Sequence, residues 1–347
     1  MKSLLKELVE TPGVSGQEHE IRDKIREEVK DHADSVEVDD MGNLIARKGE
    51  GDKTLMVATH MDQIGLAVKR VDENGFLKVT KVGGLYPESL INQRVTVHTS
   101  EGEDVTGVVG MKPPHLRRSV DENDKIPEFK EIYVDIGAED DEDAEDIGVR
   151  IGDRMTFDRD FADLQNDNVT APAFDNRTGC AVLIEAIKEF DEDYELAAVF
   201  STQEEVGTKG ARTSAFGIDP DVALAVDVTM AGDVPGIEPD QSDEALGDGV
   251  GIDMLQASGR GLIPSENVTD WLLETAEEGD HDYYRGLYDG GATDAAGIYI
   301  SRDGIPTGSL GIPTRNLHSP IEIVNVKDLK KMKNFLSDAF GSMPEYF

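Results

Sequence analysis

The sequence predicts an α/β protein whose α/β part is interrupted by a β-rich insert. Segments typical of helices and of strands alternate at the start of the 347-residue chain, short strand-like runs without a long helix fill the middle, and the alternation then returns. A chain of this length also exceeds what one core usually serves. We therefore expect a discontinuous α/β domain of residues 1–69 and 163–347, and an inserted β-rich domain of residues 70–162.

The first section is expected to hold two helices followed by three strands. The helical segments "SLLKELVE" and "HEIRDKIREEVKDH" flank a Pro-Gly turn. Ser15 is placed to cap the second helix, with Glu18 three residues later as its capping-box partner. The strands are "SVEVDD", "NLIARK" and "TLMVATH". The last is apolar on both faces, which predicts a strand buried between helices.

The insert is predicted from short alternating runs that end in glycine or turn residues. These runs are "FLKVTKV", "RVTVHT", "DVTGVVG", "EIYVDIG" and "GVRIGDRMTFD". Between them, the polar segment 115–131 is expected to be a long mobile loop. The acidic run "AEDDEDAED" (138–146) is expected to be a short solvated helix or turn rather than a binding site.

The last section returns to α/β alternation. "NVTAPAFDNRTGCAVLIEAIKEF" predicts a loop and then a helix, "ELAAVFST" and "VALAVDVT" predict strands, and "TDWLLETAEEG" predicts a helix. Two more strand-like runs are expected within "AAGIYISRDGIPTGSLGI", and the chain is expected to finish on a helix. Cys180 is the only cysteine, so no intrachain disulfide can form, and we expect a buried structural thiol.

Composition limits the classes of partner. With 34 Lys and Arg against 72 Asp and Glu, the net charge is −38, which repels nucleic acid and anionic membranes. The strand-like runs argue against a disordered acidic chain, and favour a folded protein with an acidic, hydrated surface as in halophiles. The start "MKSLLKELVE" lacks the apolar core of a signal peptide, and no stretch reaches the roughly 18 apolar residues of a membrane helix. A soluble, cytoplasmic protein is expected.

Polar residues gather where the predicted α/β strands end. His60 and then Asp62 follow one strand, Glu204 and Glu205 follow another, and Asp227 lies inside a third. Asp175 precedes a helix, and His318 lies in a turn before a proline. Because open α/β sheets place their sites beyond the carboxyl ends of their strands, these side chains could share one crevice.

The residue types in this crevice suit a metal centre. Two histidines and several carboxylates, without a thiolate, suit Zn²⁺ or a similar divalent ion. The donors suffice for two ions sharing one carboxylate, and such a pair can bind a bridging hydroxide and polarise a carbonyl. A further carboxylate is then needed to move the proton, which would give adjacent glutamates different roles.

Each residue alone has an ordinary explanation. A histidine at a strand end is more often structural than a ligand, and two adjacent glutamates usually form a solvated turn. Asp227 is harder to dismiss, because "ALAVDV" leaves little room for a solvated charge. Among other enzymes, a serine hydrolase is not supported, since the "GxSxG" turn is absent, and the glycine clusters do not match phosphate-binding loops.

At these motifs the chain resembles the tetrahedral (TET) aminopeptidases, metal-dependent peptidases related to glutamyl aminopeptidases. The motifs are "TPGVSGQE", "ATHMDQIGLAV", "KPPH", "APAFDNRTG", "TQEEVGTKGA", "AVDVT", "GGATDAAG" and "TRNLHSP". They span nearly the whole chain, and together they are far more specific than any one of them. One departure is "DQIG" where the family often has "DEIG", and it changes no expected ligand.

The resemblance implies a role for each residue of the crevice. His60 and Asp227 would be the terminal ligands of one metal ion, and Glu205 and His318 those of the other. Asp175 would be the bridging carboxylate. The catalytic residues would be Glu204, as the general base and acid, and Asp62, as the carboxylate that orients and polarises the imidazole of His60. Two divalent ions per subunit, Zn or Co with Mn possible, are implied as cofactors.

The resemblance also implies a fold, an assembly and an activity. The fold would be a three-layer α/β/α catalytic domain with a mixed sheet and an inserted PDZ-like β-barrel domain used in dimerisation. Dimers would assemble into a hollow homododecamer, and the substrates would be peptides with a free N-terminus. Two alternatives stay open: a dinuclear N-acyl amino-acid deacylase or carboxypeptidase-like amidohydrolase, and a metal-binding shell protein without turnover.

Overall fold

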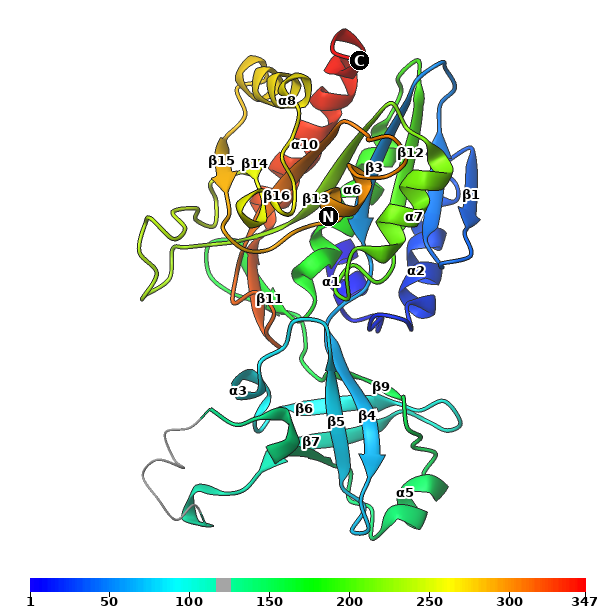
Figure 1. The fold of residues 1–347 in the computed structure, drawn as a ribbon, viewed down its shortest axis with the longest axis vertical. Helices are drawn as coiled ribbons and strands as arrows, with labels where there is room; N and C mark the ends of the chain where they lie inside the picture. The colour runs from blue at the N-terminus through cyan, green and yellow to red at the C-terminus, as the bar shows by residue number, and fades with distance from the viewer. Residues whose placement is uncertain (117–125) are drawn as a thin grey trace.

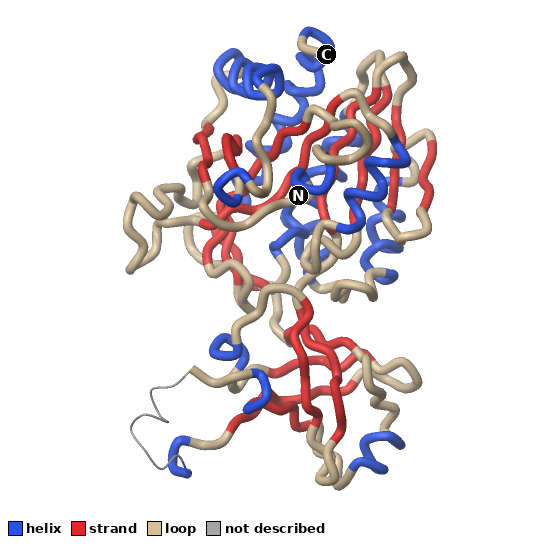
Figure 2. The backbone as a smooth tube through the Cα atoms, in the orientation of Figure 1, coloured by secondary structure: helices blue, strands red, loops and turns tan. Residues whose placement is uncertain are grey.

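The computed structural model describes residues 1–116 and 126–347, so residues 117–125 of the expected loop 115–131 lie outside the described residues. An α/β part and a closed β-barrel lie at opposite ends of the molecule's long axis (Figure 1, Figure 2). The predicted fold class is thereby confirmed. In the described residues, no helix is both long enough and apolar enough to cross a bilayer.

A large mixed sheet forms the centre of the α/β part. Its main path runs β1-β2-β12-β3-β13-β16-β17-β11-β10, and β14 and β15 extend it from β16. Strands β12, β3, β13 and β16 are parallel neighbours. The strands are β1 (Ser35–Val38), β2 (Leu44–Lys48), β3 (Thr54–His60), β10 (Ala162–Asp163), β11 (Asn168–Ala171), β12 (Glu195–Ser201), β13 (Val222–Met230), β14 (Val250–Leu255), β15 (Tyr283–Leu287), β16 (Thr307–Arg315) and β17 (Glu322–Asn325).

Helices cover the sheet on both faces, which gives the three layers. On one face α6 packs against α1, α2 and α10, and α8 packs against α10; on the other face α7 packs against α9 and β12. The helices of the α/β part are α1 (Lys2–Val9), α2 (His19–Val29), α6 (Phe174–Glu189), α7 (Lys209–Ile218), α8 (Glu266–Glu278), α9 (Ala295–Ile298) and α10 (Val326–Ser342). Short 3₁₀ helices lie at Ala257–Gly259 and Met343–Glu345.

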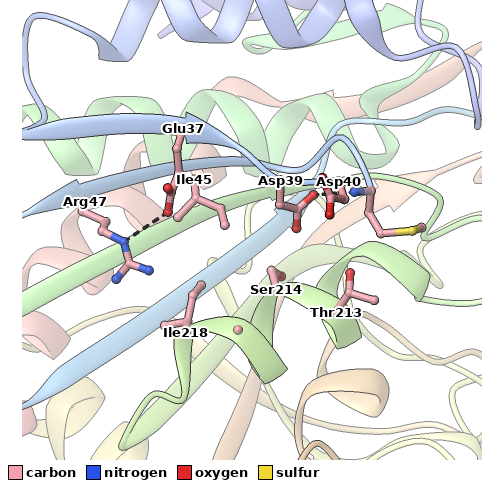
Figure 3. A pocket seen from close by; sticks show the side chains of 10 residues that line it. Glu37, Asp39, Asp40, Ile45, Arg47, Thr213, Ser214 and Ile218 are labelled. Atoms are coloured by element: carbon pink, nitrogen blue, oxygen red, sulfur yellow. Dashed lines mark hydrogen bonds and ion pairs between the residues drawn. The ribbon is translucent and has the colours of Figure 1, made fainter.

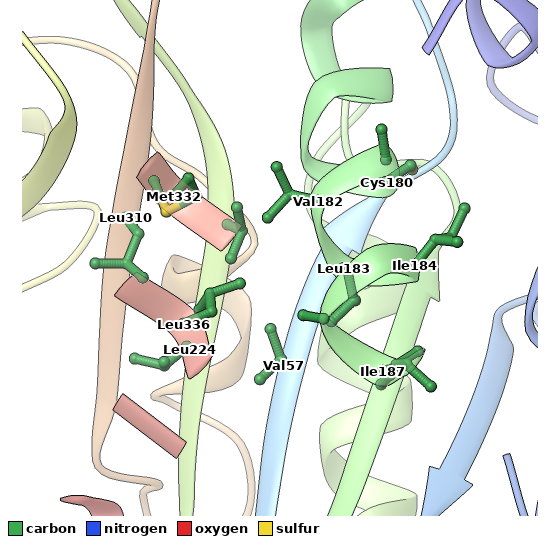
Figure 4. Packing of buried hydrophobic residues seen from close by; sticks show 14 of the residues in the cluster. Val57, Cys180, Val182, Leu183, Ile184, Ile187, Leu224, Leu310, Met332 and Leu336 are labelled. Carbon is green, nitrogen blue, oxygen red and sulfur yellow. The ribbon is translucent and has the colours of Figure 1, made fainter. Parts of the chain in front are cut away.

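Strand β3 shows why its sequence is apolar on both faces. Leu55 and Val57 belong to the core cluster under α6 and α10, whereas Met56 and Ala58 belong to the cluster on the α7 side. Successive strand residues point to opposite faces, so a strand covered on both sides needs an unbroken apolar run. Figure 4 shows Val57 packed among side chains of α6, such as Leu183.

The barrel has the strand order β4-β5-β8-β7-β6-β9 and its own buried apolar core. Its strands are β4 (Gly65–Val71), β5 (Leu77–Val82), β6 (Arg94–His98), β7 (Val105–Met111), β8 (Ile132–Asp135) and β9 (Arg154–Phe157). Short helices accompany them: α3 (Pro87–Leu90), α5 (Asp141–Asp146), and 3₁₀ turns at Pro114–Leu116 and Phe129–Glu131. Helix α5 is the solvated helix expected in the acidic run. The boundary expected at residue 70 falls within β4.

Two local expectations are wrong. The run "AAGIYI" is not a strand, because Ala295–Ile298 forms α9, whose apolar side chains pack beside α7. Ser15 does not cap α2: the helix begins at His19 with Glu18 as its N-cap residue, and no side chain caps it. The Ser15 hydroxyl instead donates to Asp62, 47 residues along the chain. Cys180 is buried, as expected.

Candidate metal centre

The candidate site lies at the carboxyl ends of the parallel strands. His60 is the last residue of β3 and is the register partner of Ser201, the last residue of β12. Asp62 and Glu204 therefore follow neighbouring strand ends. Asp227 lies within the next strand, β13, and pairs in register with Gly311 of β16. The structure thus brings these predicted residues to one edge of the sheet.

One group of possible metal ligands consists of His60, Asp175 and Asp227. A ligand atom from each lies within 4.8 Å of the others, and all three residues are buried. His60 Nε2 lies 2.9 Å from Asp175 Oδ1 and 3.6 Å from Asp227 Oδ1. The other ring nitrogen, Nδ1, lies 3.0 Å from the backbone carbonyl of Asp62. A proton on Nδ1 donated to that carbonyl leaves Nε2 free as a ligand.

A second group consists of Asp175, Glu205 and His318. His318 Nε2 lies 3.3 Å from Asp175 Oδ2 and 3.7 Å from Glu205 Oε2. Asp175 belongs to both groups, with Oδ1 toward one imidazole and Oδ2 toward the other. This is the arrangement that a carboxylate shared between two cations needs.

Glu204 lies beside the first group without belonging to either. Its Oε2 is 4.0 Å from His60 Nε2, and its side chain is about nine-tenths buried. Burial, together with the negative charges of Asp227 and Asp294, raises the pKa of Glu204 well above its ordinary value, although His60 opposes the shift. Glu205 belongs to the second group, whereas Glu204 lies beside His60 of the first, so the two neighbouring glutamates are directed to different parts of the site.

The charges of the site fit bound cations. Burial and the proximity of Asp175 raise the pKa of Glu205 to about 8, and burial also raises the pKa of Asp227. Glu205 Oε1 is buried without a hydrogen-bond partner. In the described residues, the ion pairs of these carboxylates come from His60 and His318, not from Lys or Arg. Buried carboxylates in this excess are costly unless cations pair with them, and carboxylate and imidazole ligands suit divalent ions.

The barrel reaches the site through the loop after β5. His318 Nδ1 donates to the backbone carbonyl of Gly84 at 2.8 Å, which directs Nε2 to Asp175. A Cβ atom on Gly84 would lie 2.5 Å from His318 Nδ1, and one on Gly83 would lie 3.1 Å from Glu205 Oε2. Glycine is therefore required at Gly84 by the close approach of its backbone to the imidazole.

Comparison with known proteins identifies the family. A profile for the M42 glutamyl aminopeptidases matches residues 42–335. The chain belongs to this family. Membership places this M42 protein among the aminopeptidases, which are hydrolases acting on peptide bonds, and confirms the resemblance read from the motifs.

Relatives and solved structures agree over nearly the whole M42 chain. A lysyl aminopeptidase of Pyrococcus furiosus is 39% identical over 338 residues, covering 94% of this chain and 92% of the relative. The aminopeptidase APDkam598 of Desulfurococcus kamchatkensis has a TM-score of 0.94 at 37% identity, covering 99% of this chain and 95% of that one. The TET1 peptidase of Pyrococcus horikoshii, described as assembling into a tetrahedron or a large octahedral shell, has a TM-score of 0.87 at 32% identity, with 97% and 98% covered.

Asp62 has two sets of contacts in this M42 site. Its Oδ1 lies 3.6 Å from His60 Nδ1, too far for a hydrogen bond. The carboxylate instead accepts the backbone N–H groups of Glu204 at 3.0 Å and Glu205 at 3.3 Å. Asp62 thus contacts the imidazole through its backbone carbonyl, and the glutamate turn through its side chain.

Sequence reasoning missed two buried acids of this site. Glu322 accepts the backbone N–H of Asp175 and that of His318, both at 3.0 Å, and so supports two possible ligands. Asp294 accepts the Ser201 hydroxyl at the end of β12, and burial raises its pKa to about 7. A charge within the apolar run "IEIV" was the available signal for Glu322.

A cavity of about 410 Å³ lies elsewhere, between β1, β2 and α7 (Figure 3). Its lining includes Glu37, Asp39 and Arg47, and none of the predicted site residues. Asp39 accepts hydrogen bonds from its own turn, including the backbone N–H groups of Met41 and Asn43, and Glu37 pairs with Arg47. We assign this cavity no part in the chemistry.

Proposed function

We propose that the protein removes N-terminal residues from peptides by a reaction that depends on two divalent ions per subunit. The observation that carries this proposal is Asp175, which supplies one carboxylate oxygen to each of two ligand groups. His60 and Asp227 would complete one site, and Glu205 and His318 the other. Zn or Co is proposed for both sites, with Mn possible, because these nitrogen and oxygen ligands accept all three.

The proposed division of labour follows from the chain's own side chains. When bound, the ions would polarise the scissile carbonyl and activate the attacking water. Glu204, which belongs to neither ligand group, would accept a proton from that water and later give it to the leaving amine nitrogen. The carbonyl of Asp62 and that of Gly84 hold the imidazoles in one orientation. Negative charge around the crevice favours a substrate amino group.

The surroundings favour a free-amine substrate over an N-acyl amino acid. A deacylase or carboxypeptidase needs a cation, usually arginine, for the substrate carboxylate. Arg177, close in sequence to Asp175, is buried, and its guanidinium donates to the backbone carbonyls of Leu8 and Thr11 instead. Among the described residues, no Lys or Arg side chain forms an ion pair with the acids of the site, so the arginine that a deacylase uses to bind a substrate carboxylate is not seen there.

The experiment compares aminoacyl-nitroanilides with the same substrates blocked at the nitrogen, with and without metal. We expect cleavage of the free-amine substrate that is lost on chelation and restored by Zn²⁺ or Co²⁺, with no cleavage of the blocked form. Elemental analysis should find two ions per subunit. Preferential cleavage of N-acetyl amino acids would support the deacylase alternative, and metal binding without any turnover would support the shell protein.

The insert of residues 70–162 is proposed to mediate self-association, and the full particle is proposed to be a homododecamer built from dimers. Support comes from the fold shared with the TET1 peptidase. Light scattering on size-exclusion fractions measures the mass, and deletion of the insert is not a suitable test because Gly84 belongs to the site. A monomer at every salt and protein concentration would contradict this assembly.

A further inference from the structure

The turn after β12 is held through the backbone amides of Glu204 and Glu205. Glu204 and Glu205 donate their N–H groups to Asp62, one to each carboxylate oxygen. The backbone amide of Gln203 also interacts with the buried carboxylate of Glu18 and opposes the rise that burial causes in the pKa of Glu18. Gln203 has a φ of 56°, in the left-handed region that a residue with a Cβ seldom adopts. Asp62 thus holds the turn in an otherwise unfavourable conformation, with the carboxylate of Glu18 beside the Gln203 amide.

Both carboxylates depend on the N-terminal segment before α2. The Ser15 hydroxyl donates to Asp62 Oδ2 at 2.6 Å, and Glu18 Oε1 accepts the backbone N–H of Gly16 at 2.7 Å. Ser15 and Glu18 are 3% and 6% exposed, and Asp62 is fully buried. A parallel bridge between Val14 and Gln63 fixes the segment beside the residue that follows Asp62.

A capping role would be the ordinary explanation for a serine and a glutamate at this spacing. The structure does not support it, because α2 receives no side-chain cap and the Ser15 hydroxyl points to Asp62. The polar groups of this segment are instead directed at the turn that carries Glu204 and Glu205.

We propose that Ser15 and Glu18 are positioning residues that hold the 203–205 turn, so that Glu204 and Glu205 face different parts of the site. Fixed amides make the two side chains diverge: Glu205 joins the group with His318, while Glu204 lies beside His60. The role of Glu204 in this inference rests on the proposed function. The effect on Glu205 concerns metal affinity and does not.

The first test compares Ser15→Ala with Ser15→Thr, which keeps a hydroxyl. We expect Ser15→Ala to lower kcat about 10- to 100-fold with little change in KM, since small misplacement of a reacting group has effects of this size. Ser15→Thr should restore most of the loss. The matched control is Ser214→Ala, which removes another serine that is 3% exposed and bonds within α7. A loss of kcat in the control equal to that of Ser15→Ala would overturn the inference.

A double mutant separates positioning from general stabilisation. If Ser15 acts on the reaction through Glu204, adding Ser15→Ala to Glu204→Gln should cause no further loss of kcat when both variants are assayed at saturating metal, which removes the separate effect on Glu205. Full multiplication of the two losses would contradict the proposal.

A metal-binding measurement tests the effect on Glu205 and does not depend on peptidase activity. Ser15→Ala and Glu18→Gln should each release Co²⁺ to a chelator at an about tenfold lower chelator concentration than wild type, because the Glu205 amide loses its support. Ser214→Ala should match wild type, and the melting temperature of each metal-free variant checks its fold. Unchanged Co²⁺ retention in both variants would overturn the proposal. If wild type cleaves no peptide, the proposed function fails while this measurement still decides the inference.

Discussion

At the scale of single residues, Glu204 and Glu205 point in different directions because they lie in a turn, not because they alternate along a strand. Strand β12 ends at Ser201, so the alternation of a strand does not reach the two glutamates. The turn separates the two side chains instead, because Asp62 accepts both backbone N–H groups and the side chains then point in different directions. Two buried negative charges in one turn are tolerated where histidines and divalent cations can pair with them.

Substitution of Glu204 should therefore affect catalysis, and substitution of Glu205 should affect metal binding. Glu204→Gln should retain both metal ions and lose about 10²- to 10⁴-fold in kcat, the usual contribution of a general base. Glu205→Ala should lose metal from the group with Asp175 and His318. Elemental analysis and steady-state kinetics measure the two effects, with Glu50→Gln, an exposed loop glutamate, as control. Equal metal loss in both site variants would contradict the division of roles.

At the scale of elements, the first turn of α10 carries a buried acid whose titration should affect stability. Burial raises the pKa of Asp328 to about 6 from its ordinary 3.8, and its Oδ2 accepts the Gly247 N–H at 2.7 Å. Because the folded state holds this proton more tightly than the unfolded chain, the free energy of unfolding should fall as pH rises from about 4 through 6.

Asp328→Asn removes this dependence. Relative to wild type, the variant should gain up to about 3 kcal/mol of stability between pH 4 and pH 7, from about 1.4 kcal/mol for each unit of pKa shift. Denaturant unfolding across this range at fixed salt measures it, and Asp270→Asn, at an exposed position on α8, is the control. Parallel curves for wild type and Asp328→Asn would refute the expectation.

The loop after β5 gives a second prediction at this scale. Gly84→Ala places a Cβ where His318 Nδ1 lies, so the imidazole must move and its bond to the Gly84 carbonyl must weaken. We expect metal affinity to fall about tenfold or more while the barrel stays folded. Chelator competition measures the affinity. The control, Gly217→Ala, adds a methyl group in α7 where nothing lies within 4 Å, and equal affinities in the two variants would exclude this role for the loop.

At the scale of the whole molecule, the net charge of −38 should make stability depend on salt. Like charges repel over about 10 Å at 0.1 M salt and about 3 Å at 1 M. We expect the melting temperature and the particle mass to rise between 0.1 M and molar KCl. Thermal unfolding and light scattering measure both, and sucrose at matched osmolality controls for general solute effects. Full stability at low salt would exclude a halophilic character and leave the peptidase proposal untouched.

Local sequence patterns predicted the fold class correctly. Predictions of single elements were wrong where one pattern is typical of two different structures. The unbroken apolar run of β3 could serve only a strand covered on both faces. The short run "AAGIYI" suits a strand or a buried helix equally, and packing beside α7 makes it helical. Ser15 and Glu18 have capping-box spacing, yet the serine hydroxyl donates to Asp62, which lies 47 residues away in the sequence.

By itself the sequence determined the alternation of elements, the acidic surface, and the kinds of side chain at each strand end, because these depend on nearest neighbours and composition. Tertiary structure decided that Asp175 faces both histidines, that Asp62 holds the glutamate turn, and that the insert's Gly84 orients His318. Such contacts join residues distant in the chain. Their geometry is set by how strands order themselves in the sheet, and no local pattern encodes that order.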